Sequence, residues 1–461
     1  MKNIKHIVAL AAVLFVAAHT WAQHTISGYF SDGYMYRHDI NPAIGNNQNY
    51  VSLPFLGNIN MGIRGSLNLE DYIYVKNGKT TTFLNPSVSA NEFLGNIKDE
   101  NKLHFDTKLQ LMSTGFKGLG GYITCSSNLR TSVYAMVPKA LFQFAKEGLK
   151  NKTYDISNFG IHTNSYIEYA LGYSRNINEK LRVGAAVKYL MGIMNVDAEF
   201  NKAQLNLGND YWTAVTNAQI QASVPGLKYD TELSENSGRQ CVSGAEIEDF
   251  NFSSNGFAVD LGVEYKLNDS WKFGASLLDL GFITWGNNVL AATKDEKGNL
   301  GDKTFSTNDY KFSFEEDNEN NFEDELERLT DGLVGLYELE DAGDQGKRKK
   351  SLGATMNLAA EYTMPFYNRL SVGLINTTRF LEDFTWTEFR LSANVAPLKW
   401  FSANVNVAAG TYGCAFGWML NIHPTGFNLF VGMDQVLGKV TEEFVPLSSN
   451  ASFNLGINVP F

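Results

Sequence analysis

The segment that decides the fold is Trp386-Thr387-Glu388-Phe389-Arg390-Leu391-Ser392-Ala393-Asn394-Val395. From Thr387 onward its odd-numbered positions carry apolar or small side chains, and its even-numbered positions carry polar ones. Alternation with a period of two indicates a β-strand whose two faces lie in different surroundings. The same pattern recurs along the chain, most clearly over residues 181–189, 352–362, 401–407 and 453–461.

Two architectures use such strands. A soluble sandwich packs its apolar faces together, whereas an outer-membrane barrel turns its apolar faces to lipid and its polar faces to the lumen. Three features favour the barrel. The strands reach the roughly 10 residues that a tilted membrane span needs, their polar faces are rich in Asn, Gly and Ser, and aromatic residues gather near strand ends. Such aromatic residues suit the two interfacial girdles of a membrane barrel.

Counting alternating segments gives an all-β chain with a 14-stranded antiparallel transmembrane barrel over residues 59–461. Short turns alternate with mostly longer polar loops, as in bacterial barrels. The loop 193–254 leaves the count open, because residues 212–224 form a further strand pair in one interpretation. The fourteen expected strands are 59–69, 103–115, 119–137, 163–175, 181–192, 255–266, 271–284, 352–363, 369–380, 386–396, 400–410, 413–422, 427–434 and 451–461.

The amino terminus has the features of an export signal. A Lys-containing start precedes an apolar stretch of signal-peptide length, which ends on small Ala22, so we expect residues 1–22 to be removed. A membrane anchor is the alternative, but the apolar run is short for a span. Residues 23–58 are dense in Gly, Asn and Tyr and contain Asn41-Pro42-Ala43. This segment is either a plug inside the barrel or a plain extension along its wall.

Composition excludes several classes of protein. Lys and Arg number 38 against 49 Asp and Glu, which gives a net charge of −11. An acidic chain repels phosphate, so nucleic acid is not an expected partner. The hydrophobic content of 44% is too high for a disordered chain. Beyond residue 22 no apolar run of 18 residues occurs, which excludes a bundle of transmembrane helices.

No motif of catalysis or metal binding stands out. Glycine-rich phosphate loops and zinc-protease motifs are missing from the sequence. Cys125, Cys241 and Cys414 are isolated, and the five histidines after residue 22 lack the spacing of metal ligands. We therefore expect no enzyme activity, no cofactor and no metal site.

Three further segments interrupt the strand pattern. Residues 138–149 predict a short helix in a loop, acting either as a latch over the mouth or as packing for neighbouring loops.

Residues 315–344 hold 13 acidic residues and one basic residue, with apolar positions at helical spacing. They predict an amphipathic acidic helix that is either a solvated loop or a site for a basic partner. A third alternative is a calcium loop at Asp317-Asn318-Glu319-Asn320, although the glycine and the spaced ligands of such a loop are missing. The run 276–282 breaks the alternation, so we expect a bulge or a kink at Leu280-Gly281, either an ordinary rim bulge or a sideways opening in the wall.

The inferred lumenal face carries charge. These groups form either a selectivity ring or neutral ion pairs that stiffen the barrel. The predicted lumen-facing residues are Arg182, Lys188, Asp260, Glu264, Glu361, Glu388 and Arg390.

The chain resembles a group of uncharacterised outer-membrane barrels of Bacteroides-type bacteria. The resemblance spans most of the chain after the signal peptide. It is carried by Gly28-Tyr29-Phe30, residues 34–37, Asn41-Pro42-Ala43, residues 51–54, 128–131, 137–139, 169–173 and 274–285.

More distantly the chain is similar to the FadL-type superfamily, whose members have 14 strands and an amino-terminal hatch with Asn-Pro-Ala. The resemblance implies that Asn41, Pro42 and Ala43 lie in a hatch, and that the protein moves a hydrophobic small molecule. Some related barrels instead anchor secretion partners. The charged residues inferred for the lumen differ from the apolar lining expected of a channel for hydrophobic molecules. A similarity of fold does not by itself establish the function.

Together these observations predict an integral protein of the bacterial outer membrane, surrounded by outer-membrane lipid. The terminal aromatic Phe461 resembles the signal that barrel-assembly machinery recognises. Two functions remain: passage of a small hydrophobic or amphipathic molecule through a plugged lumen, or a scaffold whose long loops bind a surface or secretion-system partner.

Overall fold

The computed structural model describes residues 25–67, 71–76, 79–148, 150–248, 251–310, 322–436 and 450–461. The expected signal peptide, residues 1–22, lies outside them. Within the described residues fourteen antiparallel strands close into one barrel, because the last strand pairs with the first, Leu455 of β25 lying opposite Ile59 of β2. This confirms the predicted fold class and strand count. No helix in the described part of the chain is long and apolar enough to cross a bilayer.

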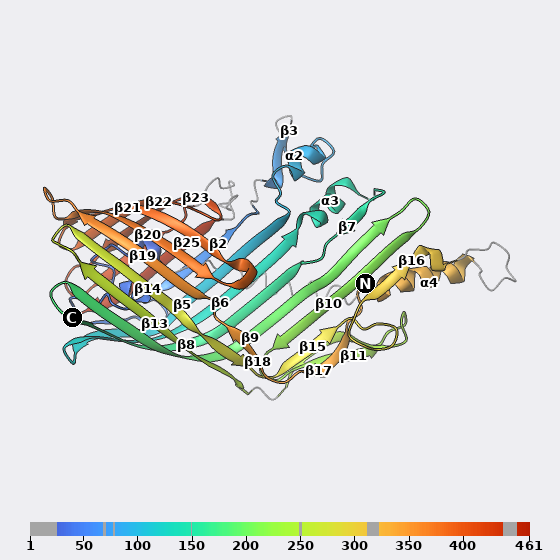
Figure 1. Cartoon of the computed structure of the whole chain (residues 1–461), viewed down its shortest axis with the longest axis horizontal. Helices are drawn as coiled ribbons and strands as arrows, with labels where there is room; N and C mark the ends of the chain where they lie inside the picture. Colours follow the sequence, from blue (N-terminus) through green and yellow to red (C-terminus); the bar gives the residue numbers. More distant parts are fainter. Residues whose placement is uncertain are drawn as a thin grey trace.

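The barrel strands follow the order of the chain around the cylinder (Figure 1). They are β2 (Ile59–Gly65), β5 (Glu100–Gly118), β6 (Gly121–Pro138), β8 (Gly160–Asn176), β9 (Leu181–Leu207), β13 (Ser254–Lys266), β14 (Trp271–Trp285), β19 (Ala354–Thr363), β20 (Leu370–Phe380), β21 (Trp386–Leu398), β22 (Phe401–Gly410), β23 (Gly413–Ile422), β24 (Asn428–Met433) and β25 (Ala451–Pro460).

The two ends of the barrel differ. At one end, which we call the turn end, the strands are joined by short connections. The connection 119–120 is an example of the shorter ones, and 364–369 is an example of the longer ones. The other end, the loop end, carries the long connections and two short ones, 381–385 and 411–412. The short strand β1 (Tyr50–Ser52) lies at the turn end between β25 and β5, where Val51 faces both Val459 and Thr114. It therefore extends β2 within the seam that closes the barrel.

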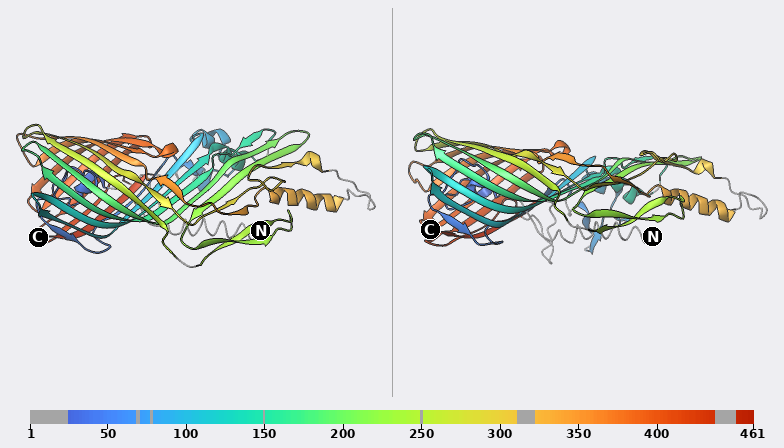
Figure 2. Two further views of the ribbon diagram at one scale, coloured as in Figure 1. Left: turned by 60° about the horizontal axis from the view of Figure 1, so that its bottom comes forward. Right: turned by 90° about the horizontal axis from the view of Figure 1, so that it is seen from below.

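Only part of the barrel wall continues past the loop end (Figures 1 and 2). There β9 runs on to Leu207 and pairs with β10 (Trp212–Ser223), which pairs on its other side with β15 (Asn288–Ala292) and β16 (Lys303–Ser306). The strand suspected at 212–224 is thus real, but it belongs to this extension and leaves the barrel at fourteen strands. The extension also contains β7 (Thr153–Asp155), β17 (Glu340–Asp344) and β18 (Arg348–Ser351), while the hairpins β3 (Ile73–Lys76) with β4 (Lys79–Thr82) and β11 (Leu227–Leu233) with β12 (Gln240–Ile247) form separate two-stranded sheets.

The α-helices of the described residues all lie in connections between strands. The helix predicted at 138–149 is α3 (Lys139–Glu147), and α2 (Ala90–Leu94) lies in the preceding loop. The acidic helix predicted over 315–344 is wrong at its carboxyl end: α4 (Phe322–Gly335) stops at a glycine, and Glu340 pairs with Ala292 in β17. Residues 315–321 lie outside the described residues. The apolar positions at helical spacing end at Leu336, and residues 340–344 form a strand because they pair with β15, which is distant in the sequence.

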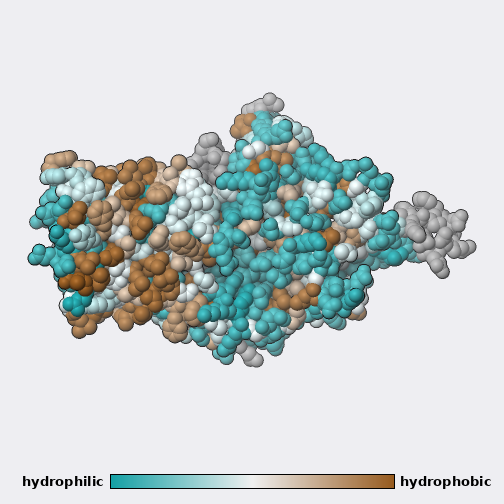
Figure 3. Space-filling model, viewed as in Figure 1, coloured by the Kyte–Doolittle hydropathy of each residue, from teal (hydrophilic) through white to brown (hydrophobic). Residues whose placement is uncertain are grey.

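The outer surface of the barrel is apolar, whereas the extension is largely polar (Figure 3). Phe389 on the outer face is 56% exposed, but its neighbour Arg390 on the inner face is 1% exposed. A closed cylinder with this pattern is the inverse of a soluble barrel and requires a hydrocarbon surrounding. Exposed apolar side chains of the band include Leu171, Val187, Leu261, Leu358, Leu374, Leu391, Val405, Val407, Phe416, Phe453 and Val459.

The irregularity predicted at Leu280-Gly281 lies slightly earlier in β14. Gly281 pairs regularly with Ala258, and the bulge falls at Leu278 and Asp279, opposite Asp260 of β13. Asp279 has φ +58°, a conformation that non-glycine residues seldom adopt. The bulge lets Asp279 turn into the lumen, while the pairing of β14 with β13 continues on either side. Towards β13 the wall is paired through Leu280 and Gly281, whereas on the other side of β14 the pairing stops at Leu278 with β19 and resumes at Phe282 with β18.

Candidate functional site

The barrel lumen is filled by residues 25–49, which we call the lumenal segment and which is blue inside the barrel in Figures 1 and 2. It contains two single turns of 3₁₀ helix, η1 (Ile26–Gly28) and η2 (Arg37–Asp39). Its first end is held by Asp434, whose carboxylate accepts the backbone N–H groups of Ile26 at 2.9 Å and of Ser27 at 2.7 Å. Asp434 is fully buried, so both bonds lie away from bulk water.

Asn41, Pro42 and Ala43 lie against the opposite wall. The Asn41 side chain donates to the Val263 carbonyl of β13 at 3.1 Å and accepts the N–H of Ala43 at 3.0 Å. The Pro42 carbonyl lies so close to Gly184 of β9 that a Cβ there would meet it at 2.1 Å. A glycine at 184 is therefore what allows the segment to approach the wall at this point.

An aromatic cluster joins the lumenal segment to β24. Tyr34 and Tyr36 make edge-on contacts with Phe430, at 4.9 and 5.9 Å between ring centroids, and Tyr36 meets Tyr50 of β1 at 5.5 Å. All four rings are buried. The remaining links are mostly polar, such as Asn404 donating to the Ser27 carbonyl and Asn428 to the Gly33 carbonyl, both at 2.8 Å.

Halfway along the lumen lies a buried charge cluster. Arg130 of β6 binds the Asp279 carboxylate with two parallel bonds of 2.9 Å and also meets Glu168 of β8 at 2.9 Å. Lys188 of β9 lies 2.7 Å from both Asp260 and Asp279. Three carboxylates thus share two cations in a site shielded from water, and each carboxylate has at least one cationic partner, which buried charges require.

The seven lumen-facing residues predicted from the alternation lie at three levels. Arg182, Glu264 and Glu361 lie near the turn end, where Arg182 faces Glu264 across the ladder. Lys188 and Asp260 belong to the charge cluster. Glu388 and Arg390 lie near the loop end and pair with each other at 2.7 Å.

Sequence reasoning missed part of the cluster. Arg130 and Glu168 are single charges on otherwise weakly polar strand faces, and the alternation of β6 and β8 contained that signal. Asp279 was hidden because three leucines surround it and the bulge inverts its direction.

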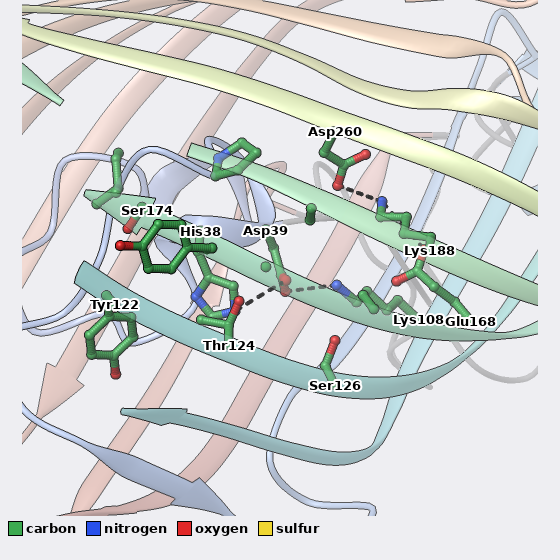
Figure 4. Close-up of a pocket in the computed structure, with 16 residues that line it drawn as sticks. His38, Asp39, Lys108, Tyr122, Thr124, Ser126, Glu168, Ser174, Lys188 and Asp260 are labelled. Carbon is green, nitrogen blue, oxygen red and sulfur yellow. Dashed lines mark hydrogen bonds and ion pairs between the residues drawn. The ribbon is translucent and has the colours of Figure 1, made fainter. Parts of the chain in front are cut away.

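Two small cavities border the lumenal segment. One, of about 30 Å³, lies between His38, Asp39 and Pro42 and the wall around Lys108 and Lys188 (Figure 4). In it Lys108 of β5 lies 2.7 Å from Asp39, which ties the lumenal segment to the wall. The other cavity, of about 40 Å³, lies towards the loop end beside Asp106, Arg130 and Arg379. A cavity needs roughly 10–15 Å³ for each water, so these spaces fit a few waters and no larger molecule.

The loop-end mouth is covered by aromatic side chains. Phe384, in the single turn η5 (Glu382–Phe384), is 6% exposed and lies 5.2 to 5.8 Å from the rings of His104, Tyr134 and His162. This arrangement differs from the polar mouth of a water-filled pore.

One group among the described residues has metal-ligand geometry. The ligand atoms of His162, Asp197 and Glu199 lie within 4.8 Å of one another. Asp197, however, already accepts from Arg348 at 2.5 Å and Lys350 at 2.6 Å. Two cations at the central carboxylate disfavour a third, so we assign the group to an ion-pair network that ties β18 across to β9.

The closed cylinder with an apolar belt defines a β-barrel of the outer-membrane type. The chain belongs to a family of unknown function (DUF5723), whose model matches residues 42–434. A comparison with curated protein sequences found no match.

Among solved structures, the chain resembles the Ralstonia pickettii toluene transporter TbuX at 8% identity, with 93% of this chain and 94% of that chain covered and a TM-score of 0.44. It resembles a Pseudomonas aeruginosa FadL homologue at 10% identity, with 95% and 96% covered and a TM-score of 0.41. The translocator domain of autotransporter NalP from Neisseria meningitidis gives 6% identity, 93% of both chains and a TM-score of 0.34. Likenesses this weak identify no cargo.

Proposed function

We propose that the protein is an integral outer-membrane barrel that admits a small hydrophobic or amphipathic molecule when the lumenal segment moves. The observation that carries this proposal is a closed barrel whose lumen is blocked by a segment of its own chain, with two small cavities beside that segment. A barrel that serves only as an anchor has no need of a separable lumen filling.

The way the lumenal segment is held supports movement. Its links to the wall are non-covalent: hydrogen bonds, the Asp39–Lys108 pair and one buried hydrophobic cluster, in which aromatic and aliphatic side chains of the segment meet Ala359, Ile375, Met419 and Phe430. Hydrogen bonds to the wall are exchanged for bonds to water at a small net cost, about 0.5–1.5 kcal/mol each. The segment joins the wall at β1, at the turn end, so withdrawal towards that end needs no break in the barrel.

The direction of passage follows from the two ends. Bacterial barrels have short periplasmic turns and longer outer loops, so we assign the turn end to the periplasm. A molecule from outside then meets the rings of Phe384, His104 and Tyr134 before it reaches the lumenal segment. These rings favour an apolar or amphipathic cargo over a simple ion.

The test is deletion of residues 23–50, followed by conductance recording in planar bilayers. The deletion variant should show larger or more frequent openings than the full-length barrel, because the lumen loses its filling. Folding is checked by the mobility shift of the folded barrel on unheated gels. A folded deletion variant with unchanged conductance overturns the proposal.

The alternative function is a scaffold for a surface or secretion-system partner, and the extension favours it. The α4 helix exposes Leu326, Leu333 and Val334, an apolar stripe beside acidic residues that suits a basic, amphipathic protein segment. Crosslinking and pull-down from cells should then recover a partner that is lost when residues 315–344 are removed. If the same proteins are recovered with and without 315–344, the scaffold fails.

Two partners follow from the barrel itself. The apolar band contacts outer-membrane lipid, and Phe461, which is 69% exposed after β25, is the residue we propose for recognition by the barrel-assembly machinery.

A further inference from the structure

The short loop 381–385 places one aromatic side chain over the barrel mouth. Within this loop the Phe384 N–H donates to the Leu381 carbonyl at 2.7 Å, and Thr385 Oγ1 accepts from the Leu381 N–H at 3.0 Å and donates to the Glu382 carbonyl. The loop is thus internally bonded and behaves as one unit. Phe384 points away from that unit and is its buried member.

The ring of Phe384 lies in a box made by three strands. The box is formed by His104 of β5, at 5.2 Å between ring centroids, Tyr134 of β6 at 5.4 Å and His162 of β8 at 5.8 Å. The two histidine rings meet Phe384 close to edge-on, at 70° and 72°. Edge-to-face contacts of this kind select a flat aromatic ring over a saturated one of the same size, because they depend on the charge distribution of the ring.

The box also holds an unpartnered polar atom. His104 is 1% exposed, and its Nε2 lies 2.9 Å from the Tyr412 hydroxyl. Its Nδ1 is buried and has no hydrogen-bond partner among the described residues. A buried polar nitrogen without a partner is unfavourable, and a molecule with a polar group beside its ring relieves that cost.

The loop is held over this box by Phe384 and by Leu381, which packs against the same buried cluster, and it joins two strands that are paired up to Arg379 and Trp386. Outside its own bonds, the described contacts include Lys102, which donates to the Asp383 carbonyl at 2.5 Å and whose Nζ lies 5.9 Å from the Phe384 ring centre. Glu382 has φ +36°, a left-handed conformation that is strained for a non-glycine residue.

Beneath the box lies the cavity of about 40 Å³ that is lined by Asp106, Arg130 and Arg379, among others. Arg379 joins the two spaces, because it is one of the residues around the cavity and its Nη2 donates to the Tyr134 hydroxyl of the box at 3.2 Å. A molecule that displaces Phe384 therefore stands directly above the path to the lumenal segment.

We propose that the box around Phe384 is a binding site for a small aromatic molecule with one polar substituent, and that Phe384 occupies it as a stand-in until such a molecule displaces the loop. The inference rests on the proposed passage function, since the site then selects the cargo at the mouth. The ring of the molecule takes the place of the Phe384 ring, and its polar group meets His104 Nδ1.

The experiment measures binding directly, without transport. Isothermal titration of the folded, detergent-solubilised protein compares 4-methylphenol with its saturated analogue 4-methylcyclohexanol. In Phe384→Ala the stand-in is removed, so 4-methylphenol should bind at least about 10-fold more tightly than to the unmodified protein, and the saturated analogue should gain much less. The matched control is Phe389→Ala, which removes a phenylalanine from the outer face of the same strand region and should change nothing.

The polar contact has its own test. In the Phe384→Ala background, His104→Phe keeps a ring in the box but removes Nδ1, and it should abolish the preference for 4-methylphenol over toluene. An equal gain for both analogues, or no gain in Phe384→Ala, overturns the site.

If Phe384→Ala does not fold, Phe384→Leu replaces it in the binding experiment. If neither variant folds, the Phe384 ring is required for folding, and this outcome also overturns the proposal. Tighter binding together with unchanged conductance of the 23–50 deletion refutes passage and leaves the binding site standing.

Discussion

The bond between Asp434 and the start of the lumenal segment offers a single-atom test of how that segment is held. Asp434→Asn replaces one carboxylate oxygen by an NH₂ group and leaves the backbone contacts of residue 434 with Arg390 and Ser452 in place. In the native protein the two oxygens accept from Ile26 and Ser27 at 2.9 and 2.7 Å. The amide keeps one acceptor, loses the charge, and sets a donor against an N–H.

The size of the effect follows from the bonds lost. A buried hydrogen bond to a charged group contributes about 1.5–3 kcal/mol. Losing one, and weakening the other, should cost the seated state about 2–3 kcal/mol, which raises the ratio of displaced to seated segment by about 30- to 150-fold at 1.4 kcal/mol per tenfold change. The open probability of single channels in planar bilayers should rise by a similar factor.

The matched control is Asp302→Asn. This carboxylate pairs with Lys202 at 2.8 Å in the extension, is 40% exposed and lies far from the lumenal segment. It should leave gating unchanged. The reasoning is refuted if Asp434→Asn folds and gates like the unmodified protein while deletion of residues 23–50 opens the barrel, since the segment is then held by other contacts.

Three further outcomes are expected. Asp279→Ala removes two bonds from Arg130 and one from Lys188, while these cations keep Glu168 and Asp260 as partners. It should therefore lower the free energy of unfolding in urea by about 1.5–3 kcal/mol; a loss under 1 kcal/mol would show that the charge cluster is hydrated. Gly184→Ala puts a Cβ 2.1 Å from the Pro42 carbonyl and should displace the lumenal segment, raising conductance with little change in unfolding, and normal conductance would contradict the close approach. Phe461→Ser should slow assembly into the outer membrane in pulse-labelled cells without altering the folded barrel, and normal assembly kinetics would remove Phe461 from the recognition signal.

The barrel was predictable because lipid and lumen impose opposite chemistry on alternate residues. Phe389 and Arg390 show this directly, with one exposed on the apolar band and the other buried in the lumen. The strand count also followed from the alternation, since each span repeats the same local rule.

Features that depend on distant partners were not readable in the same way. β9 continues to Leu207 because β10 pairs with it there, and nothing in residues 193–207 alone fixes that partner. Residues 340–344 were included in the predicted helical loop 315–344 but join β15. Asp279 turns inwards through a bulge whose position is set by the register with β13, and Phe384 finds its box only when β5, β6 and β8 stand side by side.

The position of β1 has a consequence for how the protein is built. The last ladder of the cylinder joins β25 to the first strand, and β1, which continues directly from the lumenal segment, is part of that ladder: Tyr50 faces Pro460 on one side and Gly115 on the other. Pairing along this last ladder therefore also fixes the carboxyl end of the lumenal segment in the wall. Closure of the barrel thus also fixes the point at which the lumenal segment enters the wall, so we expect the cylinder and its filling to form together.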